Sequence, residues 1–346
     1  MYGTTCRVIK NISEYEKKSV ETLLIKSGLR FEGAPQYTAV AEDSDENVIA
    51  TASLDGAVIK MVAADEAWQE AGLSATVISA LMQRAREDGI MHLFMFTKPE
   101  AAVKFSFLGF SALASSDKSV LMEFGSPNIN DYRAKLNELK KENGAPAAAA
   151  VMNCNPSTLG HRWLIEQGAK ENDLFYVIVV EEDASLFPFN DRIDLVRRGT
   201  ADLKNVHVLS SSHYAISAAT FPTYFLKEKT PGAIAAVQAE LDAKLFAALY
   251  VPSLGIVRRY VGTEPLSPVT ALYNDVLKKV LPPLGCSISE IVRKESGDTV
   301  ISASRVRELL AHGEFNALES LVPPTTLEYL LSDRGREIAK KLRKQI

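Results

Sequence analysis

Two short motifs, far apart in the chain, contain residues whose types and spacing suit phosphate binding. The first is Thr158-Leu159-Gly160-His161, and the second is Ile-Ser-Ala-Ser-Arg-Val-Arg at residues 301–307. Gly160 lets the backbone come close to an oxygen atom, and His161 can donate a hydrogen bond to it. Together the two motifs predict a nucleotide site that cleaves ATP between its α- and β-phosphates.

The first motif lies where a strand is expected to pass into a helix. Residues 147–153 are mostly apolar and predict a buried strand, Pro156 forces a turn, and a helical pattern begins at Arg162. A helix N-terminus attracts phosphate because its first N–H groups lack partners and the helix dipole is positive there. The alternative for His161 is a histidine that only caps a helix or packs in a core.

The second motif is expected to open another helix. Ser302 is a plausible N-cap for a helix over residues 303–312, which would leave Ser304 and the first-turn N–H groups free for a phosphate. Arg305 and Arg307 oppose the helix dipole unless an anion is present, which favours a ligand. The alternative is that Ser302 only caps and both arginines are solvated.

The chemistry open to these residues is narrow. Near the motifs, no Ser-His-Asp or Cys-His pairing and no metal-ligand cluster is evident from spacing. Transfer at phosphorus requires in-line positioning and stabilisation of charge on oxygen. A carboxylate that attacks the α-phosphorus is already ionised at pH 7, so it needs no general base.

The elements that position these residues fall into two predicted domains. The chain has 346 residues, which is enough for two cores. A charged helical stretch over residues 131–143 is followed by Gly144-Ala145-Pro146, which breaks it. We therefore expect one domain at 1–125, a linker and helix at 126–146, and a second domain at 147–346.

The hydrophobic patterns differ between the two domains. Before the linker they predict an α+β fold around a mostly antiparallel sheet, with strands at 37–41, 48–54, 58–62, 92–96 and 119–124 and helices at 73–87 and 100–107. After it they predict parallel strands alternating with helices, with strands at 148–152, 175–180, 206–209 and 256–261. Ligands bind at the carboxyl ends of such strands, where residues 152–161 and 262–265 are expected to lie.

Composition gives weaker indications. Hydrophobic residues make up 47% and charged residues 24%, and the net charge of −4 does not predict a broad nucleic-acid surface. Three widely spaced cysteines favour neither a disulfide framework nor a zinc site. No signal-peptide core or membrane-length apolar run is evident, so we expect a cytoplasmic enzyme without a membrane or nucleic-acid partner. The basic C-terminal run predicts a solvated helix end, and the alternative is a surface that binds an acidic partner.

Several stretches carry a family resemblance. Residues 152–161 resemble the phosphate loop of the Thr/His-x-Gly-His nucleotidyltransferases, and residues 301–307 resemble their second signature. More narrowly, residues 153–156, 185–189 with Arg192, 214–217, 221–227 and 262–265 with Tyr273 and Asn274 are similar to the [citrate (pro-3S)-lyase] ligase family. The resemblance spans the chain and implies an α/β protein, with an acetyltransferase-like (GNAT) α+β domain followed by a Rossmann-like nucleotidyltransferase domain.

The N-terminal domain resembles the GCN5-related acetyltransferases in part. Residues 69–74 and 105–110 look like acyl-CoA-binding elements, which implies Gln69, Gly72 and Ser74 as CoA- or pantetheine-binding residues. Ser74 departs from the usual small Gly or Ala, and no convincing acid/base pair surrounds it. A working acetyltransferase, a degenerate CoA or pantetheine-arm binder, and a scaffold all remain open.

The resemblance implies ATP- and Mg²⁺-dependent acetylation of the thiol prosthetic group on the acyl carrier subunit of citrate lyase, through acetyl-adenylate formed from acetate. It implies His161 and Thr158 as catalytic residues. The implied nucleotide-binding residues are Asn153, Cys154, Asn155, Gly160, Gly262, Glu264, Ser302, Ser304, Arg305 and Arg307. Cys154 is expected to pack beneath the loop, and no protein ligand for Mg²⁺ is predicted.

A second enzymatic function, a structural role for one predicted site segment, and a binding role for the N-terminal domain all stay open. A nucleotidyltransferase that adenylates a phosphorylated acceptor such as phosphopantetheine would share both motifs and differ in an acceptor pocket within residues 210–227. Residues 262–264 could also be an ordinary turn before Pro265. A docking role of the N-terminal domain for the acyl carrier is compatible with the main hypothesis.

Overall fold

The structure is a computed structural model that describes residues 3–181, 185–217, 220–228, 230–265, 267–297 and 299–344, apart from the side chains of Gln69 and Glu70. Its contacts divide the chain into two compact units. Unit 1 comprises Met1–Tyr132 and Ala218–Leu241, and unit 2 comprises Arg133–Ser217 and Asp242–Ile346. The predicted limits at 125 and 147 remain predictions, but residues 218–241 belong to the unit formed by the N-terminal part of the chain.

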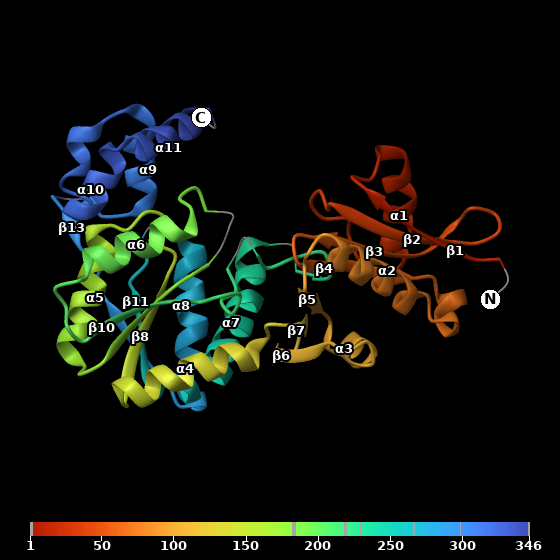
Figure 1. The fold of residues 1–346 in the computed structure, drawn as a ribbon, viewed down its shortest axis with the longest axis horizontal. Helices are drawn as coiled ribbons and strands as arrows, with labels where there is room; N and C mark the ends of the chain where they lie inside the picture. Colours follow the sequence, from red (N-terminus) through yellow and green to blue (C-terminus); the bar gives the residue numbers. More distant parts are fainter. Residues whose placement is uncertain are drawn as a thin grey trace. The chain divides into compact units, whose positions relative to one another are not determined.

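Unit 1 is built on a sheet with the strand order β1-β2-β3-β4-β5-β7-β6 (Figure 1). Its strands are β1 (Thr5–Lys10), β2 (Tyr37–Glu42), β3 (Val48–Asp55), β4 (Val58–Ala64), β5 (His92–Thr97), β6 (Ser111–Ser115) and β7 (Val120–Gly125). Its helices are α1 (Glu14–Lys26), η1 (Glu66–Ala71), α2 (Leu73–Glu87) and α3 (Pro99–Ser106), and α4 (Ile129–Asn143) begins in this unit. The predicted, mostly antiparallel sheet is confirmed, because among the described strands of this unit only β4 and β5 pair in parallel.

The core of unit 1 lies between α2 and the sheet. Leu73, Val77, Ile78 and Leu81 on α2 recur at helical spacing and are buried against apolar side chains of the strands. This spacing predicts the helix from sequence, and its bounds agree with the expected residues 73–87. Strands β1 and β6 were not predicted; both expose much of their length and lack a continuous apolar run.

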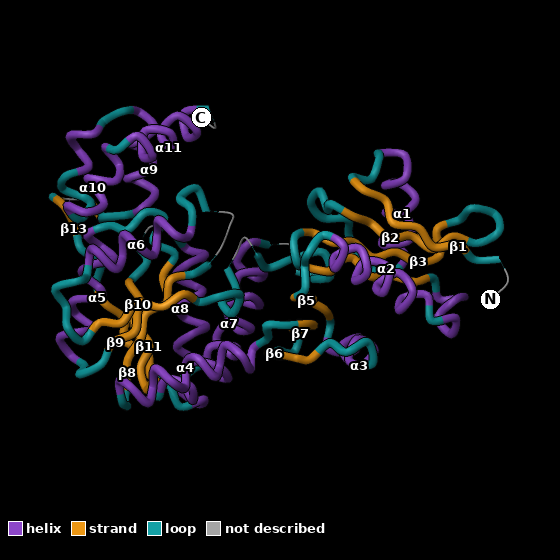
Figure 2. The backbone as a smooth tube through the Cα atoms, in the orientation of Figure 1, coloured by secondary structure: helices purple, strands orange, loops and turns teal. Residues whose placement is uncertain are grey.

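Unit 2 contains a parallel sheet with the strand order β10-β9-β8-β11-β12 and helices on both of its faces (Figures 1 and 2). Its strands are β8 (Ala147–Met152), β9 (Phe175–Val179), β10 (Val206–Ser210), β11 (Ile256–Gly262) and β12 (Ser287–Ile291), with a small ribbon of β13 (Glu295–Ser296) and β14 (Thr299–Val300). Its helices are α5 (Leu159–Glu171), α6 (Phe189–Gly199), α7 (Pro231–Leu254, from residue 242 onward), α8 (Pro268–Val280), η2 (Pro282–Leu284), α9 (Ala303–His312), η3 (Phe315–Leu318), α10 (Pro324–Leu331) and α11 (Asp333–Arg343). This architecture is the expected Rossmann-like one.

Two elements of unit 2 differ from the sequence prediction. Helix α5 begins at Leu159, whereas the helical pattern predicted a start at Arg162. Strand β12 was not predicted, because its sequence Ser-Ile-Ser-Glu-Ile alternates and is only half-buried at the sheet edge. Within the described residues, no helix is long and apolar enough to span a membrane.

Candidate active site

The loop between β8 and α5 is held by a buried arginine. Arg192 on α6 has no exposed surface. Its Nη1 donates to the carbonyl and the Oδ1 of Asn153, each at 2.7 Å, and to the carbonyl of Val180 at 2.7 Å. Its Nε donates to the Phe187 carbonyl at 2.9 Å. One cation therefore ties the ends of β8 and β9 to the start of α6 and fixes the loop.

Thr158 and His161 form a capping box at the start of α5. The His161 backbone N–H donates to Thr158 Oγ1 at 3.3 Å, and the Thr158 backbone N–H donates to His161 Nδ1 at 3.1 Å. The helix starts earlier than predicted because His161 takes the place that Glu or Gln usually occupies in this motif. Since Nδ1 accepts a hydrogen bond, the ring proton belongs on Nε2.

The surroundings of His161 keep its ring neutral. Burial lowers the pKa of His161, and the positive charge of Arg293 lowers it further, to about 4. At pH 7 the imidazole therefore has no charge and can donate one hydrogen bond from Nε2. Thr158 is fully buried, and its hydroxyl lies 2.9 Å from Nδ1, so it positions the ring.

Cys154 lies inside the loop with a left-handed backbone (φ 52°) and a buried side chain. It packs in the same apolar cluster as Met152 and Leu164. Burial raises the pKa of its thiol to about 12. The thiol therefore stays protonated at pH 7 and is a poor nucleophile, which fits the packing role expected for it.

The second motif contacts the first. Ser302 caps α9 as expected, because its Oγ accepts a hydrogen bond from the Arg305 backbone N–H at 3.1 Å. Arg307 Nη1 donates to the Asn155 carbonyl at 2.6 Å, and its Nη2 donates to Ser304 Oγ at 3.1 Å. Arg307 therefore joins the two predicted phosphate-binding segments directly.

Gly160 lies against the same segment. A Cβ atom at this position would lie 3.1 Å from the Ile301 carbonyl oxygen and 3.5 Å from Thr158 Oγ1. The sequence suggested that glycine is needed for approach to a ligand oxygen; in the structure, the close oxygen belongs to the other motif. Arg305 extends elsewhere and forms an exposed ion pair with Glu308 at 2.8 Å.

Arg293 links the turn after β11 to the first motif. Its Nε donates to the Thr263 carbonyl at 2.7 Å, its backbone N–H donates to Thr263 Oγ1 at 3.2 Å, and its guanidinium pairs with the Glu264 carboxylate. The Arg293 side chain lies against Gly262, and its charge acts on His161. The predicted residues Gly262 and Glu264 are thus next to an arginine that sequence reasoning missed because β12 was missed.

Comparisons with known proteins match this chain to one family. The family model of the citrate lyase ligase C-terminal domain matches residues 147–330. The [citrate [pro-3S]-lyase] ligase of Klebsiella pneumoniae is 38% identical over 91% of this chain and 92% of its own length. The enzymes of the same name from Escherichia coli K12 and Haemophilus influenzae are 41% identical (83% of this chain, 82% of theirs) and 35% identical (93% and 97%).

This chain belongs to the citrate lyase ligase family. Both units are covered by the match to its relatives, so the family assignment extends to the N-terminal unit. A crystal structure of an acetyltransferase from Streptococcus agalactiae matches 36% of this chain and 99% of its own, at 13% identity and a TM-score of 0.32.

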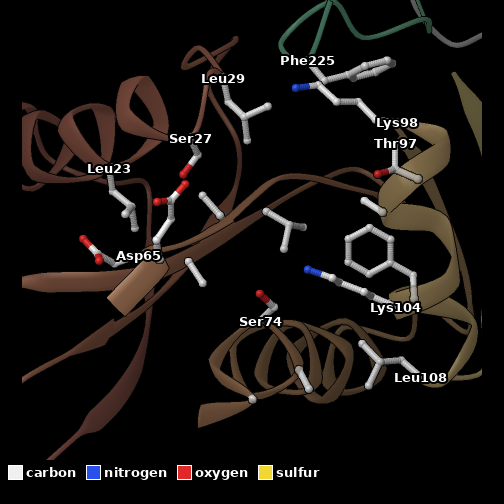
Figure 3. Close-up of a pocket in the computed structure, with 18 of the residues that line it drawn as sticks. Leu23, Ser27, Leu29, Asp65, Ser74, Thr97, Lys98, Lys104, Leu108 and Phe225 are labelled. Carbon is white, nitrogen blue, oxygen red and sulfur yellow. The ribbon is translucent and has the colours of Figure 1, made fainter. Parts of the chain in front are cut away.

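The residues predicted to bind CoA or pantetheine lie in unit 1, at the start of α2. Gly72 adopts a left-handed conformation (φ 67°) as the N-cap of α2 and offers no side-chain cap. Ser74 follows in the first turn and lines a cavity (Figure 3). The side chain of Gln69 lies outside the described residues. CoA or pantetheine binding by these three residues remains a prediction within this family member.

Proposed function

We propose that this protein activates citrate lyase by acetylating the thiol prosthetic group of its acyl carrier subunit. In the first half-reaction, a carboxylate oxygen of acetate attacks the α-phosphorus of ATP, forming acetyl-adenylate and releasing pyrophosphate. In the second, the carrier's thiolate attacks the acetyl carbon, forming a thioester and releasing AMP. The observation that carries the proposal is the hydrogen bond from Arg307 to the Asn155 carbonyl, which joins two phosphate-binding motifs in a citrate lyase ligase family member.

The roles of the residues follow from their hydrogen bonds. Neutral His161 donates from Nε2 to an oxygen of the reacting phosphate, and Thr158 fixes the ring in that orientation. Arg307 and Ser304 bind the β- and γ-phosphates, and Arg305 exchanges its exposed partner Glu308 for them. Asn153, Cys154 and Asn155 supply the loop backbone, and Gly160 keeps it against the second motif.

Arg293 is added to the predicted set as a phosphate- or ribose-binding residue together with Gly262 and Glu264. It is held by Thr263 and Glu264, so its guanidinium is oriented before the nucleotide arrives. The side chains around the loop are mostly N–H donors, which suit phosphate rather than a metal ion. Mg²⁺ would therefore be held mainly by phosphates and water, and it would supply neutralisation of the phosphate charge.

The test of the first half-reaction is ATP–pyrophosphate exchange by the purified protein with Mg²⁺, with and without acetate. Exchange that requires acetate supports acetyl-adenylate formation and needs no partner protein. Exchange with dephospho-CoA but not with acetate would favour the alternative nucleotidyltransferase, because dephospho-CoA is the product of AMP transfer to phosphopantetheine. Family membership favours the ligase over that alternative.

The second half-reaction is tested with the acyl carrier. Labelled acetate should appear on the carrier that bears its thiol prosthetic group, and hydroxylamine should release it because a thioester is cleaved. The matched control is the same carrier without the prosthetic group, which should stay unlabelled. Label on both carriers would contradict the thiol as the acceptor.

A further inference from the structure

Residues 292–294, which we call the junction, follow β12 and contact three parts of the candidate active site. The Val292 carbonyl accepts a hydrogen bond from Trp163 Nε1 on α5 at 3.1 Å. The Lys294 carbonyl accepts one at 3.0 Å from the backbone N–H of Ile301, where the second motif begins. The residue between them bonds to the turn after β11. The junction therefore connects α5, that turn and the second motif, all within unit 2.

Arg293, the middle residue of the junction, keeps one end of its guanidinium available. Its Nε donates to the Thr263 carbonyl at 2.7 Å, and its Nη2 pairs with the Glu264 carboxylate, which is 6% exposed. The Arg293 side chain is 29% exposed, and in the part of the chain that the structure describes its Nη1 has no hydrogen bond. This is the donor that a phosphate or ribose oxygen can accept from. Its direction depends on where the backbone of the junction places Arg293.

Trp163 contacts the residues on both sides of Arg293. An indole has a single N–H donor, and here Trp163 uses it on the Val292 carbonyl. Lys294 Nζ lies 5.7 Å from the centroid of the Trp163 ring, a cation–π contact. Trp163 is also two positions after His161 on α5. One helix therefore fixes the imidazole directly and the backbone of Arg293 through a single side chain.

The bond from Trp163 to the junction lies at the surface of the molecule. Val292 is 74% exposed, and Lys294 is also exposed. If the indole N–H were removed, water would bond to the Val292 carbonyl in its place, so the fold would lose little stability. The backbone on either side of Arg293 would nevertheless lose a constraint on its position. Such a bond matters more for the direction of Arg293 than for the stability of the fold.

We propose that Trp163 is a positioning residue for nucleotide binding, which holds the junction so that the Arg293 guanidinium is directed at the nucleotide. The inference rests on the function proposed above, because Arg293 is a nucleotide-binding residue only under that function. Trp163 itself does not touch the nucleotide; it acts through Arg293. Its effect on nucleotide binding should therefore disappear when Arg293 is removed.

The first experiment measures ATP binding to the full-length protein by calorimetry, with Mg²⁺ and without acetate. Arg293→Ala should weaken binding about tenfold, because a charge-assisted hydrogen bond is lost. Trp163→Phe keeps an aromatic ring but has no N–H, and it should weaken binding about threefold. In the Arg293→Ala chain, the same Trp163→Phe change should weaken binding by less than about 1.5-fold. An equal effect in both chains, or none in either, overturns the proposal.

Trp68→Phe is the matched control, because it makes the same chemical change in unit 1. It should leave ATP binding unchanged. The melting temperature of Trp163→Phe should stay close to that of the wild type, because water replaces the indole N–H at the exposed Val292 carbonyl. If Trp68→Phe weakens ATP binding as much as Trp163→Phe does, the proposal is overturned, because the effect is then a general one of tryptophan replacement.

The coupling can also be measured without replacing Trp163. The chain contains two tryptophans, so Trp68→Phe leaves Trp163 as the single indole fluorophore. In that chain, Arg293→Ala should shift the emission to longer wavelength and increase quenching by acrylamide, because the junction loses its side-chain bonds to Thr263 and Glu264. Lys141→Ala, which removes an exposed ion pair on α4, should change neither quantity. Unchanged emission and quenching after Arg293→Ala overturns the proposal.

Acetate-dependent ATP–pyrophosphate exchange separates this inference from the proposed function. In that assay, Trp163→Phe should raise the KM for ATP about threefold and leave kcat nearly unchanged, because binding rather than chemistry is affected. A lower kcat with an unchanged KM overturns the positioning role. Coupled effects on ATP binding without any exchange count against the proposed function alone. Exchange in the wild type with equal effects of Trp163→Phe in both chains counts against this inference alone.

Discussion

His161 is a hydrogen-bond donor whose direction and charge are both set by its neighbours. Its Nδ1 is occupied by the Thr158 backbone N–H, so only Nε2 can face a ligand. Burial and the charge of Arg293 keep the His161 ring uncharged. The ring therefore has a single N–H donor, on Nε2. Such preorganised donors stabilise developing charge on phosphate oxygens without reorganising during the reaction.

Replacing His161 by alanine should therefore reduce acetate-dependent ATP–pyrophosphate exchange on the order of 100-fold or more, because the donor is lost. The exchange rate at saturating ATP is the measurement. His312→Ala, at the exposed end of α9, is the matched control and should keep wild-type exchange. A loss of less than threefold in His161→Ala would contradict the catalytic role assigned to His161.

The lowered pKa of His161 also predicts a pH dependence of stability. In the folded chain the pKa is about 4, and in the unfolded chain it is about 6.5. Between these pH values the unfolded chain binds a proton that the folded chain does not. The contribution of neutral His161 to the free energy of unfolding is therefore fully present above about pH 6.5 and is lost as the pH falls towards 4. The melting temperature should therefore fall less steeply over this range in His161→Gln than in the wild type. Equal slopes would contradict the lowered pKa.

At the scale of elements, the site exists because α5 and α9 bring two N-termini together. The Ile301 carbonyl lies against Gly160, and Arg307 reaches from α9 to the loop before α5. Both helices begin with a side-chain cap, Thr158 in one and Ser302 in the other. These caps set the direction of the first-turn N–H groups, which are the expected phosphate ligands.

Gly160→Ala should disturb this contact, because the new Cβ would lie 3.1 Å from the Ile301 oxygen and one motif must shift. We expect a loss of exchange of about tenfold or more, with secondary structure by circular dichroism unchanged. Gly199→Ala is the matched control, since its Cβ would be 3.6 Å from its nearest neighbour, Thr325 Oγ1. Full activity of Gly160→Ala would contradict a tight contact between the motifs.

The arginines of α9 should act on nucleotide binding. Arg307→Ala and Arg305→Ala should each raise the KM for ATP about tenfold in the exchange assay, because a charge-assisted contact to phosphate is lost. Lys141→Ala removes a comparable exposed i,i+3 ion pair with Glu138 and should leave the KM unchanged. If Arg305→Ala behaves like Lys141→Ala, Arg305 remains paired with Glu308 and does not bind ATP.

At the scale of the whole molecule, the compact units do not follow the order of the chain. Residues 218–241 are flanked in sequence by segments of unit 2 but belong to unit 1, where Phe221, Tyr224 and Phe225 are buried. Phe221 packs edge-on to Phe96, with ring centroids 5.6 Å apart. Residues 220–228 and the N-terminal part of unit 1 therefore depend on each other for burial of apolar surface.

A chain that lacks residues 1–125 should aggregate, because Phe221, Tyr224 and Phe225 would lose the surface that buries them. The soluble fraction and size-exclusion profile are the measurements. Replacing these three residues by serine in the truncated chain should raise its solubility. A monodisperse truncated chain with residues 220–228 unchanged would contradict this interdependence.

Local signals in the sequence determined much of the fold. Helix α9 and its cap follow from Ser302 before an amphipathic stretch, and α2 follows from apolar residues at helical spacing. Strands β8 and β9 follow from continuous apolar runs, because both faces of a parallel sheet are covered. The residues of the two motifs could be named for the same reason, since each motif lies at a predicted helix start.

Only the tertiary structure decided the remaining features. The early start of α5 depends on a histidine acting in a capping box, which sequence rules assign to Glu or Gln. Arg293 reaches its place through β12, an edge strand without a strong pattern. Residues 220–228 are held on the N-terminal part of unit 1 by hydrogen bonds between residues more than 190 positions apart, such as Thr223 and Glu32. Contacts over such separations leave no local period in the sequence, because they depend on which surfaces meet after the elements have formed.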